Sequence, residues 1–324
     1  MGTGHDEHTM KFIKHILVLL SIAFLAMAQA DTFPSKSIRI ITNLPVGSAP
    51  DIFVRKVANE LEKKYSVGVA VENKPGGAGI IAIEYYLSLP ADGHSILYTD
   101  FGAVVAMPIL YNREYLIEQL RTLTNSYVTR WIVVAPTKIK TIDDLRNALK
   151  ENPRYGSWGV GSGGHLCGQE VSAMLGVQTD HIPYKEQGMW FVDIINGVLP
   201  FGCTSIGSSQ SFQKSGRMSY IATTGNQRDI LYPNLPTIKE LTNHVFQTGE
   251  VWAPFFVNKK VNPIIADKLE KDLRTVINSD LLKEQAKVLG ATAWAPSGSE
   301  MSREIEKETK IYKALIKKFN ITVN

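Results

Sequence analysis

The sequence predicts an α/β protein with two domains, each built on a mostly parallel sheet, that face each other across a ligand cleft. The chain has 324 residues, which is enough for two ordinary domains with sizeable cores. Short apolar strands alternate with helices, a pattern typical of parallel sheets covered by helices. Glycine-rich loops follow several strands, and open α/β sheets bind ligands at the carboxyl ends of their strands. Two such domains predict a hinged cleft.

The N-terminus predicts export. Residues 10–15 form a short basic segment, residues 16–27 are almost wholly apolar, and Ala28-Gln29-Ala30 matches a signal-peptide cleavage site. The apolar run is too short for a comfortable membrane span. We therefore expect residues 1–30 to be a cleaved signal peptide and the mature chain to begin at Asp31. Whether Met1 or Met10 is the true start is left open.

Composition and charge exclude several function classes. The chain has 35 Lys and Arg against 31 Asp and Glu, and the signal peptide contains two of each group, so the net charge is +4 with or without it. This excess is spread along the chain without a basic tract, which argues against a nucleic-acid partner. The mature histidines, His94, His165, His181 and His244, show no metal-ligand spacing. No metal or cofactor is expected.

Cys167 and Cys203 are the two cysteines of the sequence. An oxidised pair is compatible with an exported protein, but one pair is not a disulfide scaffold. We interpret Cys167 as a small apolar residue buried in a helix, and the sequence leaves the pairing open.

The first part of the mature chain predicts three strands with helices between them. Asp51 lies where it can cap or charge-match the start of the first helix. Glycine- and proline-containing loops follow the first two strands, at residues 43–51 and 73–79. The strands are expected at residues 37–42, 67–72 and 95–99, and the helices at 51–64 and 80–89.

The same alternation continues through the rest of the chain. Capping signals open two of its helices, Thr141 with Asp144 and Ser297 with Glu300. Trp190, Trp252, Phe255 and Phe256 lie in apolar runs and are expected in the core. The strands are expected at 131–135, 155–159, 179–183, 201–204, 218–223 and 251–257. The helices are expected at 141–150, 166–175, 187–196, from 205 onward, at 262–279, at 280–289 and from 297 onward.

Residues 156–166 are the most informative segment, because five of these eleven residues are glycine and a helix is predicted to follow. Glycine lets backbone N–H groups converge, and a helix N-terminus adds unpaired N–H groups and a positive dipole end. Together they form a cradle suited to a phosphate or carboxylate. Gly159, Gly161 and Gly164 also fit a dinucleotide fingerprint, although Asp180 comes too early for its ribose contact. The alternative without a ligand is a plain surface loop.

Six segments of the mature chain carry motifs in a fixed order: residues 33–51, 70–79, 90–96, 155–169, 182–185 and 234–240. In sequence and spacing they resemble the substrate-binding receptors of tripartite tricarboxylate transporters, the Bug family. The likeness covers essentially the whole mature chain. The family's small residue before the glycine cradle is replaced here by Trp158, and its fourth loop residue, a glycine, by Ser48.

The resemblance implies a type II periplasmic binding protein, with one crossing antiparallel strand in each sheet and a two-segment hinge. It implies a periplasmic, monomeric receptor without enzymatic activity, which delivers a small organic acid to the integral-membrane subunits of the transporter. The first domain is expected at residues 31–130 and 251–324 and the second at 131–250. Two alternatives are an exported hydrolase using Ser162 or Ser205 with His165, and a carboxylate receptor that serves signalling. No G-x-S-x-G elbow supports the hydrolase.

The resemblance also assigns the ligand contacts, mainly to backbone N–H groups and ordered water in two loops of each domain. The first-domain residues are Leu44, Val46, Gly47, Ser48, Ala49, Gly76, Gly77, Ala78, Gly79, Thr99, Asp100 and Phe101. The second-domain residues are Trp158, Gly159, Gly161, Ser162, Gly163, His165, Lys185, Thr204, Ser205 and Ser208.

Single residues in this set have two interpretations each. The Trp158 indole stacks on a ligand or packs under the loop. His165 bonds a carboxylate or is a structural loop histidine. Lys185 neutralises a second carboxylate or is solvated. Thr204 stands where many family members have an acid, which favours an acid with an uncharged tail, and Asp100 either supplies that acid or caps a helix.

Overall fold

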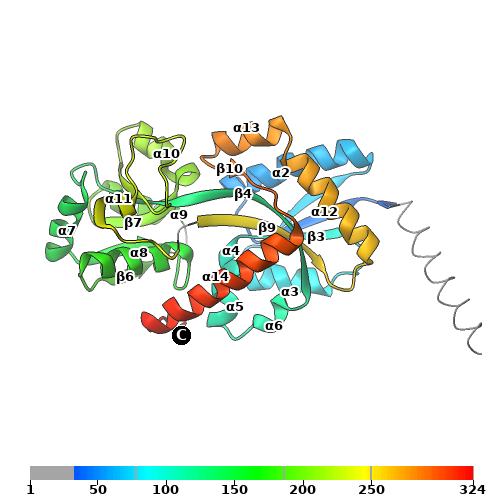
Figure 1. Cartoon of the computed structure of the whole chain (residues 1–324), viewed down its shortest axis with the longest axis horizontal. Helices are drawn as coiled ribbons and strands as arrows, with labels where there is room; N and C mark the ends of the chain where they lie inside the picture. The colour runs from blue at the N-terminus through cyan, green and yellow to red at the C-terminus, as the bar shows by residue number, and fades with distance from the viewer. Residues whose placement is uncertain (1–32, 77–78, 185–186, 249, 324) are drawn as a thin grey trace, which may run out of the picture.

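The computed structural model of the protein describes residues 33–76, 79–184, 187–248 and 250–323. The predicted signal peptide and its cleavage site lie outside the described residues. Figure 1 shows an elongated molecule in two parts, with β4(Leu120–Ala135) and β9(Glu250–Asn258) running along the long axis from one part to the other.

The first sheet has three parallel strands at one side, followed by an antiparallel strand and then by the beginning of β4. β1(Ile38–Thr42) lies between β2(Val69–Asn73) and β3(Ser95–Tyr98), with Ile40 opposite Val71 on one side and Ile96 on the other. β9 pairs antiparallel with β3. The three predicted strands are therefore confirmed. Side chains alternate along β1, so Ile40 and Ile41 pack in different buried clusters on the two faces of the sheet.

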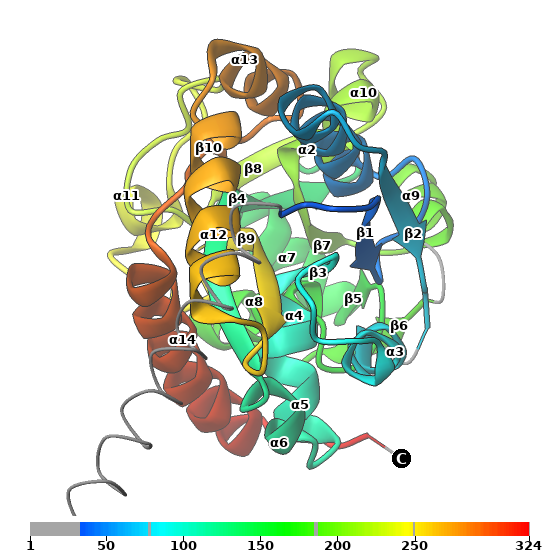
Figure 2. The same ribbon diagram turned by 90° about the vertical axis from the view of Figure 1, so that its right-hand side faces the viewer.

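Helices cover both faces of this sheet. α2(Ala49–Tyr65), α12(Pro263–Ile277) and α13(Asp280–Val288) bury one face, and α3(Ile80–Ser88) lies on the other. Figure 2 shows α2 and α13 above the strands and α3 below them. The Tyr65 hydroxyl donates to Asp272 at 2.8 Å and so links α2 to α12.

The second sheet repeats the arrangement. β5(Arg154–Ser157) lies between β6(Asp180–Pro183) and β7(Phe201–Ser205), all parallel, and β4 is antiparallel to β7 and to β8(Ser219–Thr223). One crossing antiparallel strand in each sheet is therefore confirmed. The helices of this part are α7(Ile142–Glu151), α8(Gly163–Leu175), α9(Gln187–Ile195), α10(Ile206–Lys214) and α11(Ile238–Thr242).

The prediction of a short strand at 131–135 was wrong in length, because β4 begins at Leu120. Its longer first part pairs with β9, from Leu120 opposite Asn258 to Arg130 opposite Glu250, and residues 131–135 belong to the other sheet. The predicted domain boundaries after residues 130 and 250 coincide with this last pair and stay a prediction. The first half is polar, yet Asn125 and Ser126 are fully buried, and Ser126 Oγ donates to the carbonyl of Ala253 at 2.8 Å.

The sequence also missed several short elements. These are α4(Phe101–Val104), α5(Ala106–Leu110), α6(Glu114–Ile117), α11 and β10(Thr292–Ala293). Elements this short give too few residues for periodicity to register. α4 and α5 are nevertheless almost wholly buried, and Phe101, Met107 and Leu110 lie beside Gly161 and Gly163.

The predicted capping signals and core residues are confirmed. Thr141 with Asp144 and Ser297 with Glu300 both form complete capping boxes, on α7 and α14(Gly298–Lys318). The predicted core residues Trp190, Trp252, Phe255 and Phe256 are all buried. Asp51 lies in the first turn of α2 and not at its N-cap. From there its carboxylate pairs with the Arg55 guanidinium at 3.0 Å.

Candidate ligand-binding site

The glycine cradle of the second domain is the N-terminus of α8. The helix begins at Gly163, three residues before the predicted start, with Ser162 as N-cap accepting the N–H of His165 at 3.2 Å. Gly159 (φ +123°) and Gly161 (φ +75°) take backbone conformations that favour glycine. The N–H groups of Gly163 and Gly164 find no acceptor among the described residues. Such a helix start is suited to an anion.

His165 contributes to the shape of the cradle. Its Nδ1 accepts the N–H of Gly161 at 2.9 Å, and its ring stacks on His181 with centroids 3.8 Å apart. His181 Nε2 lies 2.7 Å from Ser157 Oγ, which in turn lies 3.1 Å from Ser162 Oγ. Burial lowers the pKa of His165 to about 4, and burial with the neighbouring His165 lowers the pKa of His181 to about 3. Both rings are neutral near pH 7 and hold the loop through hydrogen bonds.

Trp158 is partly buried and lies in a row of indoles. Its ring centroid is 5.5 Å from that of Trp131 and 6.2 Å from that of Trp190. A Cβ added at Gly164 would lie 3.2 Å from the Trp158 ring, so the indole packs against the first turn of α8. The core interpretation therefore describes part of this side chain, and its exposed part remains a predicted ligand contact.

The second loop of this domain begins α10. Ser205 is the N-cap, its Oγ lies 3.0 Å from Ser208 Oγ, and Thr204 is buried at the end of β7. Cys203, the preceding residue, forms a disulfide with Cys167 of α8. Cys167 is buried in α8 as expected. The pairing that the sequence left open is a disulfide, because strand and helix bring the two sulfurs together in the core. The disulfide ties the two second-domain loops to each other.

In the first domain, Asp51 organises the loop that contains Leu44, Val46, Gly47, Ser48 and Ala49. It is buried and accepts the N–H of Gly47 at 2.8 Å and the Asn73 amide at 2.8 Å. Although burial favours its neutral form, hydrogen bonds from Arg55, Asn73 and Gly47 hold the pKa of Asp51 below its usual range. The Asn73 amide also donates to the carbonyl of Leu44 at 2.8 Å.

Asn43 joins the remaining first-domain segments and was missed by the sequence analysis. Its Nδ2 donates to Asp100 at 2.7 Å, and its Oδ1 accepts from Thr99 Oγ1 at 2.6 Å. Gly79 (φ +99°) packs against Asn43 and so closely on Ala103 that a Cβ there would overlap the alanine. Asp100 also accepts the N–H of Ala103 at 3.2 Å, so the predicted capping role of Asp100 is confirmed.

The structure brings several predicted loops of the two domains into contact. A Cβ at Gly163 would lie 3.0 Å from Phe101 Cζ, and one at Gly207 would lie 3.4 Å from Ala49 Cβ. A Cβ at Gly161 would overlap Leu110 and lie 2.9 Å from Met107 Cε. The N-termini of α2, α8 and α10 and the start of α4 thus gather at the junction. Of the other predicted residues, Val46 and Gly76 are exposed. Gly77, Ala78 and Lys185 lie outside the described residues.

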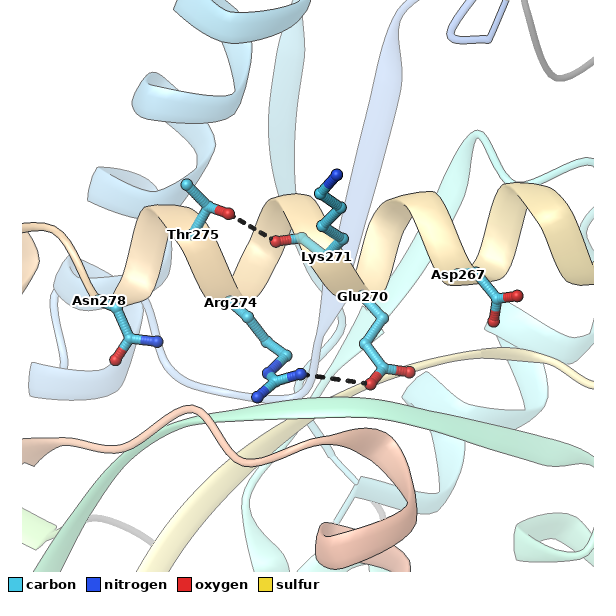
Figure 3. Close-up of a pocket in the computed structure, with 6 residues that line it drawn as sticks. All are labelled: Asp267, Glu270, Lys271, Arg274, Thr275 and Asn278. Atoms are coloured by element: carbon cyan, nitrogen blue, oxygen red, sulfur yellow. Dashed lines mark hydrogen bonds and ion pairs between the residues drawn. The ribbon is translucent and has the colours of Figure 1, made fainter.

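Two surface pockets lie elsewhere. One follows α12 and is lined by Asp267, Glu270, Lys271, Arg274, Thr275 and Asn278 (Figure 3), all from one helix face. The other lies between α8, residues 244–247 and α14. Neither is lined by a predicted site residue. Among the described residues there is no group of three or more His, Cys, Asp and Glu placed to hold a metal ion. No described helix is both long and apolar enough to cross a membrane.

Comparison with known proteins identifies the family. A sequence profile described as tripartite tricarboxylate transporter family receptor matches residues 53–321. A UPF0065 protein of Bordetella bronchiseptica is 31% identical over 230 residues, which is 69% of this chain and 68% of that protein.

Solved structures share the fold. Rpa4515 of R. palustris with adipate superposes with a TM-score of 0.81 at 21% identity, covering 90% of this chain and 99% of that one. The periplasmic binding protein BugD gives a TM-score of 0.78 at 22% identity, again over 90% and 99% of the two chains. These likenesses confirm the predicted two-domain α/β fold of periplasmic binding proteins.

Proposed function

The chain belongs to the tripartite tricarboxylate transporter receptor family, and on this premise we propose that it captures a small organic carboxylate between its two domains. The receptor then delivers the acid to the integral-membrane subunits of the transporter. The observation that carries the proposal is the N-terminus of α8, where two unpartnered backbone N–H groups and the dipole end of the helix favour an anion. The adipate bound by Rpa4515 supports a carboxylate as that anion.

The proposed contacts are the predicted residues of the four loops. Asp51 and His165 hold loop backbone N–H groups of the first and second domain, and Asn43 holds the side chains of Thr99 and Asp100. A pre-organised set of N–H donors loses little conformational entropy when the acid binds. Lys185, Gly77 and Ala78 remain part of the proposed set from the sequence alone.

The proposed domains are residues 31–130 with 251–324, and residues 131–250. The hinge is placed where Arg130 pairs with Glu250, because both connections between the domains pass through this pair of strands. Rotation about two adjacent strands is a common way for such domains to close on a ligand. We take the mature receptor to be a periplasmic monomer that begins at Asp31.

The receptor is proposed to have no catalytic activity. The alternative hydrolase gains one observation, the 2.7 Å contact between Ser157 Oγ and His181 Nε2. Ser157 is fully buried, however, and among the described residues no carboxylate orients His181. Ser162 Oγ donates to the carbonyl of Gly159 at 2.8 Å rather than to a histidine ring. A nucleophile needs an oriented base and access to substrate, and neither serine has both.

A thermal-shift screen tests the proposal. The mature protein is unfolded and refolded to remove co-purified acid, then heated with mono-, di- and tricarboxylates, aromatic acids, amino acids and esters. A ligand that binds only the folded state raises the melting temperature by mass action. We expect a clear shift with one class of acid. No shift with any acid, together with turnover of an ester, would replace the receptor with the hydrolase.

A further inference from the structure

Trp131 occupies the point where the domains and both second-domain loops meet. It lies on β4 directly after Arg130, where we place the hinge, and its Cα pairs with that of Ser205 at the start of α10. Its ring contacts Phe101 of the first domain, with centroids 6.3 Å apart. The side chain is only 2% exposed. Sequence analysis did not single it out, because Trp131 opens an apolar strand and resembles a core residue.

The indole N–H of Trp131 has no acceptor among the described residues. A Cβ added at Gly163 would overlap Trp131 Cζ2 and lie 2.9 Å from Cη2, so this side of the indole faces the first turn of α8. Nε1–H and Cζ2–H lie on the same edge of an indole, and Nε1 is a donor only. A buried tryptophan N–H usually finds a partner, so this donor lacks the acceptor that such a group normally has.

The indole N–H of Trp131 and the backbone N–H groups at the start of α8 are together complementary to a carboxylate. The N–H groups of Gly163 and Gly164 are unpartnered in the same turn toward which the Trp131 edge is directed. A carboxylate accepts several such bonds at its two oxygens, whereas a neutral carbonyl offers one oxygen. Burial makes an unpaired donor costly, and an acid that accepts from it removes this cost on binding.

Resting on the proposed function, we propose that Trp131 is a ligand-anchoring residue whose indole N–H donates to the same carboxylate as the first turn of α8. The carboxylate is then held by neutral donors from a strand and a helix. Because β4 also carries the hinge, the anchor connects bound acid directly to the strand about which the domains close.

Trp190 provides a matched control. Its indole N–H is also buried without an acceptor among the described residues, and its side chain is fully buried. Its ring packs instead on Gly202 of β7, where an added Cβ would lie 2.5 Å from Trp190 Cζ3, and its own Cβ lies beside Gly156 of β5. Replacing either tryptophan with phenylalanine therefore removes one orphan N–H and a similar volume, but only one of the two faces α8.

The first experiment compares Trp131→Phe and Trp190→Phe by calorimetric titration with adipate, malate and benzoate. A hydrogen bond to a charged group is worth roughly a tenfold or larger change in the dissociation constant. For the acid that the parent protein binds, we expect Trp131→Phe to raise the dissociation constant by about that factor. We expect Trp190→Phe to bind this acid with the affinity of the parent protein. Equal affinity of Trp131→Phe and the parent protein would overturn the proposal.

A second readout uses the unmodified protein, so it does not depend on the folding of the variant. The five tryptophans give indole ¹H–¹⁵N signals, and that of Trp131 is assigned by elimination with phenylalanine variants of the others. On addition of the acid that binds, its proton is expected to shift downfield and to exchange more slowly. An unmoved Trp131 signal with clear binding rejects this inference alone. Absence of binding by every acid rejects the proposed function, and this inference with it.

Discussion

Gly161 decides whether the cradle admits an anion. Its positive φ and its contact with Leu110 and Met107 leave no room for a side chain. We expect Gly161→Asp to weaken acid binding roughly a hundredfold or more, because it adds a like charge within a few ångströms of the ligand carboxylate. Calorimetric titration with the acid found in the screen measures this change.

Gly161→Ala is the matched control for that substitution. It introduces the same backbone strain and the same overlap with Leu110 without the charge. The aspartate variant should therefore bind at least roughly tenfold more weakly than the alanine variant. A folded Gly161→Asp protein that binds as tightly as the parent would show that the anion does not lie at this cradle.

The stacked pair His165 and His181 predicts a pH dependence of stability. Burial holds their pKa values at about 4 and about 3, below the ordinary 6.5. At a pH between the folded and the unfolded pKa values, these two histidines bind protons in the unfolded chain but not in the folded one. The free energy of unfolding therefore falls as the pH drops below 6.5. In the His165→Asn, His181→Gln double variant, we expect a smaller loss of melting temperature between about pH 7 and about pH 5. An undiminished loss would contradict the assignment.

At the residue scale, the sequence located the loops but not the side chains that fix them. Glycine content and motif spacing alone identified residues 156–164 and 43–51. Asn43 was missed because a single amide in a loop gives no periodic signal, and its importance depends on Asp100 and Thr99, which are distant in sequence. Trp131 was missed for a similar reason: its unpaired N–H is visible only once the neighbours of the ring are known.

Among the elements, α8 and β7 are linked by the Cys167–Cys203 disulfide, which closes a loop with a sequence separation of 36. Cross-linking a loop of this length stabilises a protein by about 2–4 kcal/mol. We expect the Cys167→Ala, Cys203→Ala double variant to lose that amount of unfolding free energy in denaturant titration. A reducing agent should lower the stability of the parent protein and leave the double variant unchanged. Equal stability of the two proteins without reductant would contradict this role.

Most strands and helices could be predicted from apolar runs, capping residues and turn residues, with ends displaced by a few positions. β4 shows where this fails. Its first half carries Thr124, Asn125 and Ser126, a polar run that resembles a loop, yet all three are buried. Thr124 Oγ1 donates to the carbonyl of Pro296 at 2.7 Å, a partner far along the chain. Buried polar side chains with distant partners cannot be separated from exposed ones by local pattern.

At the scale of the whole molecule, one long strand, β4, joins the two sheets. β4 and β9 pair over the first half of β4, and the remainder of β4 enters the second sheet. The alternation of strands and helices predicted both sheets and their parallel core. The pairing of β9 with β3 joins segments too distant in the chain for sequence patterns to reveal, so the return of the C-terminal segment was expected only from the family resemblance. Domain closure about these strands follows from the proposed function.

The most direct test of the central claim is calorimetric titration of the refolded, acid-free mature protein with adipate, malate and benzoate. We expect saturable binding of one acid per chain with a dissociation constant in the micromolar range or below, which corresponds to a binding free energy of about −8 kcal/mol or more favourable. The same titration of Gly161→Asp should give no comparable binding. A folded protein that binds none of these acids, or whose binding is unaffected by Gly161→Asp, would contradict the claim that the helix starts at the domain junction receive a carboxylate.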